Sequence, residues 1–271
     1  MTNKTIFSKF HVRTVGIVVA LAAIISGGTV AYASHSWGGY HWARTANPFT
    51  LNLGDNVGAS WDSYLATAST DWSQSTVLDT KIVPGSTDPK QCKAKNGRVE
   101  VCNSRYGYNG WLGVASIWVS GSHITQGMVK VNDSYFNTAT YGTPAWREFV
   151  MCQEVGHTFG LDHQDTNFTN TNLGTCMDYT NDPDGTLYGQ LSNLHPNQHD
   201  YDEIGIIYSH LDSITTIGAA AFSKGNNVDV NMDDSSVWGK EIRKDSRGHS
   251  SLFERDLGKG NKLFTFVLWV E

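Results

Sequence analysis

The sequence predicts an α+β fold, in which short strands and a few helices occupy successive stretches of one chain. Three observations indicate it: strand-like segments dominate residues 49–131, a well-capped helix begins near Pro144, and another begins after Asn197. The chain has 271 residues, of which 39% are hydrophobic and 17% charged, so it can form one sizeable packed domain.

The first 33 residues carry the pattern of a secretory signal peptide. Basic residues precede an apolar run over 15–30, and Ala31-Tyr32-Ala33 supplies the small residues of an A-x-A cleavage site. We therefore expect cleavage before Ser34 and a secreted mature protein. The alternative is an uncleaved membrane anchor, because the apolar run is nearly long enough to span a bilayer.

Charge and hydropathy exclude several classes of partner. The formal net charge is -6 and no basic stripe is present, which argues against a nucleic-acid-binding surface. No segment after the leader is apolar enough to cross a membrane, so we expect no stable membrane association after cleavage. The sequence shows no internal repeat, so a repeat architecture is not expected. We expect the protein to be a monomer.

Strand predictions rest on alternation and on β-branched and aromatic residues. The first helix is predicted over 62–73, where Trp61, Tyr64, Leu65 and Trp72 supply apolar contacts. A final strand follows a stretch rich in Gly, Asn, Asp and Ser, so residues 213–271 are predicted to form a C-terminal extension. The predicted strands cover residues 49–53, 77–83, 99–103, 111–119, 124–131 and 263–270.

Two helices carry clear start signals. Thr143 can cap the first and Pro144 suits its first position, whereas Gly160 can take the left-handed conformation that ends a helix. Asn197 can cap the second, with Asp200 three residues later as in a capping box.

The four cysteines all lie in the exported part of the chain, where an even number suggests two disulfides. Cys92 and Cys102 flank Asn96-Gly97, which is typical of a hairpin turn, so a Cys92–Cys102 bond is the simplest of the three possible pairings. Cys152 and Cys176 would then form the second bond. The alternative is four free buried thiols.

The stretch from Gln153 to His163 concentrates groups that bind metal. Gln153 and His157 are four residues apart and share a helix face, and Glu154 lies beside them. A turn at Gly160 lets His163 return to the same point. Neutral imidazole is a natural zinc ligand, and a neighbouring carboxylate can take the proton of a water molecule that a metal has made acidic.

This stretch resembles the zinc motif H-E-x-x-H-x-x-G-x-x-H of the metzincin metallopeptidases, which include matrixin-like and astacin-like enzymes. Glu154, His157, Gly160 and His163 match the motif, whereas Gln153 stands where the family has its first zinc-binding histidine. The resemblance covers roughly residues 47–211. It implies a twisted mixed sheet with an active-site helix and a C-terminal helix, and a metallopeptidase domain over 34–212.

A second match follows at Cys176-Met177-Asp178-Tyr179, which resembles the Met-turn beneath the metal of that family. Met177 and Gly160 would then be structural. In the astacin-like and serralysin-like branches a tyrosine two residues after the methionine approaches the metal and stabilises the oxyanion, and Tyr179 holds that place. The strand over 124–131 resembles the strand that borders the family's substrate cleft.

The resemblance implies a secreted zinc endopeptidase that cleaves protein or peptide substrates, with Glu154 as general base and His157 and His163 as zinc ligands. Gln153 is the doubtful third ligand, because an amide oxygen binds zinc more weakly than imidazole; Tyr179 could complete the shell instead. The alternative is an inactive relative that serves as an extracellular binding protein. Structural calcium is compatible with the Asp- and Asn-rich loops, although no EF-hand pattern is present.

Overall fold

The computed structural model describes residues 35–218, 232 and 234–270, which belong to one compact unit, Ala33–Glu271. The predicted signal peptide and its cleavage site lie outside the described residues. The described strands form one ten-stranded sheet, with the order β3-β2-β5-β7-β6-β10-β9-β8 and with β1 and β4 also paired to β7. None of the described helices is long and apolar enough to cross a membrane.

Strands and helices follow one another much as the sequence predicts. The strands are β1 (His41–Trp42), β2 (Phe49–Asn56), β3 (Leu78–Pro84), β4 (Lys95–Asn96), β5 (Val99–Ser104), β6 (Trp111–Ser120), β7 (His123–Asn132), β8 (Lys240–Lys244), β9 (Ser250–Gly258) and β10 (Asn261–Trp269). The helices are α1 (Asp62–Trp72), α2 (Asp133–Phe136), α3 (Pro144–His157), α4 (Gln198–Ile207) and the 3-10 turn η2 (Ser235–Val237).

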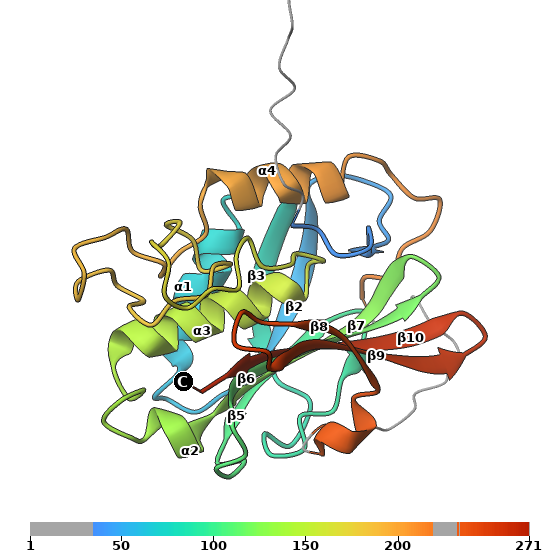
Figure 1. Cartoon of the computed structure of the whole chain (residues 1–271). Coiled ribbons are helices and arrows are strands. Elements are labelled where there is room, and N and C mark those ends of the chain that lie inside the picture. The colour runs from blue at the N-terminus through green and yellow to red at the C-terminus, as the bar shows by residue number, and fades with distance from the viewer. Residues whose placement is uncertain (1–34, 219–231, 233, 271) are drawn as a thin grey trace, which may run out of the picture. The chain divides into compact units, whose positions relative to one another are not determined.

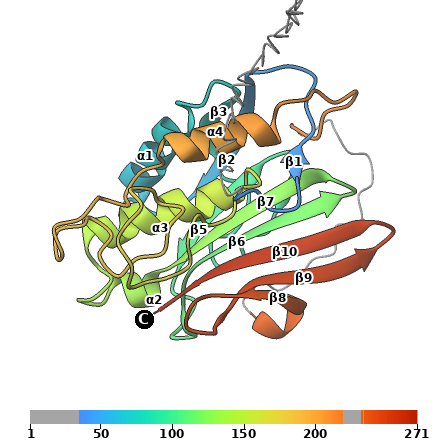
Figure 2. The same ribbon diagram turned by 45° about the horizontal axis from the view of Figure 1, so that its top comes forward.

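The predicted α+β class and twisted mixed sheet are confirmed (Figure 1). β3, β2, β5 and β7 run parallel, and from β7 outward through β6, β10, β9 and β8 each strand is antiparallel to the one before. The helices α1, α3 and α4 lie on the same side of the sheet in both views (Figures 1 and 2).

Both predicted helix starts are present. Thr143 accepts a hydrogen bond from the backbone N–H of Trp146 at the start of α3, with Pro144 in the first turn. At α4 the Asn197 side chain accepts from the N–H of Asp200 while the Asp200 carboxylate accepts from the N–H of Asn197, which completes the capping box.

Two strand-level predictions are wrong. The segment 124–131 was expected at the edge of a cleft, but β7 lies inside the sheet between β5 and β6. Asn96-Gly97 was expected to form a hairpin turn, but β4 pairs with β7 and not with β5. Alternation along one strand specifies which side chains share a face, but it does not specify the strand's neighbours.

The C-terminal extension continues the sheet. β10 pairs antiparallel with β6 over nine residues, and β9 and β8 follow outward (Figure 2). Successive side chains of β10 enter opposite layers: Phe264 and Phe266 join the core beneath α3, whereas Leu263 and Val267 pack into a second cluster with Trp238. β10 is therefore buried on both faces over most of its length.

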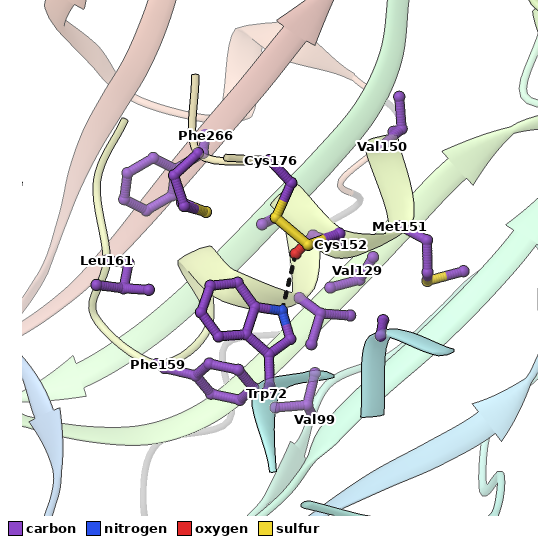
Figure 3. Packing of buried hydrophobic residues seen from close by; sticks show 14 of the residues in the cluster. Trp72, Val99, Val129, Val150, Met151, Cys152, Phe159, Leu161, Cys176 and Phe266 are labelled. Atoms are coloured by element: carbon purple, nitrogen blue, oxygen red, sulfur yellow. Dashed lines mark hydrogen bonds between the residues drawn. A yellow bond between two sulfur atoms is a disulfide. The ribbon is translucent and has the colours of Figure 1, made fainter. Parts of the chain in front are cut away.

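The core beneath α3 is cross-linked to the segment that follows it. Both predicted disulfides, Cys92–Cys102 and Cys152–Cys176, are present. Trp72 at the end of α1 donates from its indole Nε1 to the carbonyl oxygen of Cys152 at 3.1 Å, beside the second disulfide (Figure 3). A bond between Cys152 on α3 and Cys176 fixes the helix to the turn that contains Met177.

Candidate active site

The last turns of α3 place three polar side chains in the interior. Gln153, Glu154 and His157 are at most 1% exposed, and His163 is 8% exposed. Gly160 has φ +98°, and a Cβ at that position would lie 2.2 Å from the carbonyl oxygen of Tyr40. Only glycine fits this turn, which carries the chain back so that His163 faces His157.

The two imidazoles meet through one nitrogen each. His157 Nε2 lies 2.9 Å from His163 Nε2. His157 Nδ1 donates to the carbonyl oxygen of Leu161 at 2.9 Å, so its Nε2 carries the lone pair in the neutral ring. Burial lowers the pKa of His157 well below its usual range and also lowers the pKa of His163. Both rings are therefore neutral near pH 7, which is the form that binds metal.

Three acceptor atoms near this pair lack a partner. Gln153 donates from Nε2 to the carbonyl oxygen of Cys176 at 2.8 Å, but its Oε1 is buried without a hydrogen bond. Neither carboxylate oxygen of Glu154 has a hydrogen-bond partner. Burial raises the pKa of Glu154 well above its usual range. Buried unpaired acceptors are costly unless a cation, proton or water satisfies them.

β6 leaves room for Glu154. A Cβ at Gly113 would lie 2.4 Å from Glu154 Oε1. Glu154 does not combine with the two histidines into a group of three ligand atoms close enough to share one ion, among the residues that the structure describes. This placement suits a carboxylate that acts on a water molecule better than one that binds the metal.

Met177 packs against α3, the helix that carries Gln153, Glu154 and His157. A Cβ at Gly156 of α3 would lie 2.7 Å from Met177 Sδ and 2.6 Å from Trp72 Cζ2, so the helix needs glycine there to approach the turn. Tyr179 is fully buried, and its ring centroid lies 4.4 Å from that of His163. Burial raises the pKa of Tyr179, so its phenol stays protonated and can donate a hydrogen bond.

The C-terminal strands cover this site. Phe266 on β10 stacks on His157, with ring centroids 4.2 Å apart and planes 7° from parallel. The Tyr179 hydroxyl donates to the carbonyl oxygen of Val267 at 3.3 Å. Arg243 on β8 forms an ion pair with Asp162, the residue before His163. Sequence analysis missed these contacts, because the alternation of residues 263–270 indicates a strand but not the groups beneath it.

Comparisons with known proteins give a distant likeness only. No protein-family profile matches the chain, and no curated protein matches it. Among solved structures, high choriolytic enzyme 1 of the medaka fish Oryzias latipes, a hatching-enzyme zinc protease, matches with 13% identity and a TM-score of 0.34, covering 64% of this chain and 96% of that one. Myroilysin matches with 12% identity and a TM-score of 0.33, covering 65% and 83%. Similarity at this level does not assign the chain to a family.

Proposed function

We propose that this protein is a secreted zinc-dependent endopeptidase. The observation that carries the proposal is that the buried His157 Nε2 and His163 Nε2 lie 2.9 Å apart, with Gln153, whose Oε1 has no hydrogen-bond partner, one helical turn before His157 on α3. Two neutral imidazoles and an amide oxygen form a donor set that fits Zn²⁺. The two disulfides agree with folding in an oxidising compartment.

Each side chain has a separate role in this proposal. His157 and His163 hold the metal, and Gln153 completes the protein's contribution through Oε1. A zinc ion at this point supplies a Lewis acid that makes a water molecule acidic near neutral pH. Glu154 takes the proton of the attacking water and passes it to the leaving amine. The Tyr179 hydroxyl donates to the oxyanion that forms at the scissile carbonyl.

The described conformation is then a latent one. An extended peptide would add to the sheet along β6, but β10 already pairs with that strand. Phe266 and Val267 occupy the contacts that a substrate needs at His157 and Tyr179. A protein or peptide substrate therefore reaches the site only when β10 loosens from β6, which loss of the Phe266 ring from the core favours, and this gives the C-terminal extension an inhibitory role.

A second candidate function is an inactive extracellular binding protein of the same fold. Two contacts favour this second function. Gln153 Nε2 donates to the carbonyl oxygen of Cys176, and the Phe266 ring covers His157. Both contacts suit a site that no longer turns over substrate. Neither candidate involves nucleic acid, and both are compatible with a monomer.

The two functions separate in one experiment. Zinc content and hydrolysis of a quenched fluorescent peptide are measured for wild type, Phe266→Ala and Gln153→His. An endopeptidase binds zinc as wild type and cleaves the peptide faster once Phe266 is removed. A binding protein shows no hydrolysis in Phe266→Ala even when zinc is bound. If only Gln153→His holds zinc at His157 and His163 and cleaves the peptide, the natural site has lost its function and the binding protein is the better-supported function.

A further inference from the structure

A second group of histidines lies outside the candidate active site. His41 on β1 and His123 at the start of β7 face one another across a parallel pairing, with β1 alongside β7 (Figure 2). His210 and Asp212 belong to the segment that follows α4. Three parts of the chain that are distant in sequence therefore contribute side chains to one point.

Ligand atoms of His41, His123 and Asp212 all lie within 4.8 Å of one another, close enough to hold one ion, and His210 lies beside this group of three. Asp212 Oδ1 lies 3.4 Å from His41 Nε2, 3.1 Å from His123 Nε2 and 3.7 Å from His210 Nε2. His210 Nε2 also lies 3.1 Å from His41 Nε2. Zinc binds nitrogen and oxygen at about 2.0–2.2 Å, so neighbouring ligand atoms in a tetrahedron are about 3.3–3.6 Å apart.

The outer hydrogen bonds of the cluster orient its inner nitrogen and oxygen atoms toward one another. His41 Nδ1 donates to the carbonyl oxygen of Gly39 at 2.9 Å, so the Nε2 of the neutral ring is an acceptor that faces the Asp212 carboxylate. The other carboxylate oxygen, Oδ2, accepts from Arg44 through Nη1 at 3.0 Å and through the backbone N–H at 3.2 Å. Arg44 also donates to the carbonyl oxygens of Tyr208 and His210, which fixes this segment.

We infer that His41, His123 and Asp212 form a second zinc site, and that the partly exposed His210 beside them turns in to complete the shell when zinc binds. With His210 turned in, four protein ligands leave no open position for a substrate, which is the arrangement of a structural rather than a catalytic zinc. The His41 and Asp212 side chains are at most 9% exposed, whereas that of His210 is 53% exposed and offers a path for the ion. A bound zinc would join the segment before β2 to β7 and to the chain after α4. This inference does not rest on the proposed peptidase activity.

The test uses full-length mature protein with the active-site histidine removed, His163→Ala, and adds Zn²⁺ alone. We expect this variant to retain about one zinc per chain after gel filtration, because His41, His123 and Asp212 remain in place to bind it and His210 can complete the shell. Adding His210→Ala should weaken zinc binding at least about tenfold, since loss of even an outer-shell partner costs 10- to 100-fold. It should also remove the rise in Tm that zinc produces.

His249→Ala is the matched control. The His249 side chain is 51% exposed and pairs with Asp245, so its loss should leave zinc affinity unchanged. His210 is similarly exposed, and its replacement is compatible with folding. The inference is overturned if the His163→Ala protein holds no zinc at micromolar metal, or if His210→Ala and His249→Ala bind it equally well. Hydrogen bonds from the histidines to Asp212 would then account for the cluster.

Discussion

Removing the ring that covers His157 should both destabilise the protein and open the candidate active site. Phe266 is 1% exposed and joins the core beneath α3, so Phe266→Ala leaves a cavity there. Replacing a buried phenylalanine by alanine typically costs about 3–5 kcal/mol. For a domain of this size that corresponds to a fall in Tm of about 6–20 °C.

Phe264→Ala is the control for this change. Phe264 lies two residues away on the same strand, is fully buried, and packs on Trp37 with ring centroids 3.6 Å apart. Its loss should lower the Tm by a similar amount, although it does not uncover His157. The pair therefore separates opening of the site from general loss of stability.

Carbethoxylation of His157 in zinc-free protein, followed by peptide mass spectrometry, measures the opening. We expect Phe266→Ala to raise the rate roughly tenfold or more over wild type, because a buried group otherwise reacts only through local opening. Phe264→Ala should stay close to wild type. Equal rates in the two variants would refute the reasoning, since His157 would then react through unfolding and Phe266 would not be its cover.

Two further outcomes follow from the geometry of α3 and its neighbours. Gly113→Ala should lower peptide hydrolysis about 100-fold, because the added Cβ would collide with Glu154 and a displacement of a catalytic group by about 1 Å is enough for such a loss. Gly205→Ala on α4 is the control. A Cβ there meets nothing within 4 Å, so hydrolysis should stay unchanged. Burial raises the pKa of Glu148 from 4.5 to about 7, so the folded state binds more protons than the unfolded state between these values and stability should fall as pH rises through this window. In thermal unfolding from pH 4.5 to 7, Glu148→Gln should reduce that fall, and an unchanged pH profile would contradict the assignment.

Features that depend on nearby residues could be predicted from the sequence. The caps at Thr143 and Asn197 and the turn at Gly160 involve groups within a few positions, so local patterns specify them. The convergence of His157 and His163 follows from the same helix and turn. The bond between Cys152 and Cys176 could be inferred only after Cys92 and Cys102 had been paired.

Features that depend on distant partners could not be predicted. The antiparallel pairing of β10 with β6 joins segments about 150 residues apart in sequence. The alternation of side chains along either strand does not specify which strand it pairs with. The cover that Phe266 places over His157 follows from that pairing. His41, His123 and His210 are also far apart in sequence, so no short motif marks the cluster that they form with Asp212.

The comparison of wild type with Glu154→Gln tests the proposed function most directly. Zinc content and hydrolysis of a quenched fluorescent peptide are measured on the same preparations, with Phe266→Ala as the common background so that the site is open. We expect equal zinc in both proteins and loss of hydrolysis in Glu154→Gln, because the imidazoles of His157 and His163 hold the metal while the carboxylate moves protons. Hydrolysis that survives Glu154→Gln, or an active-site zinc that disappears with it, would contradict this division of roles.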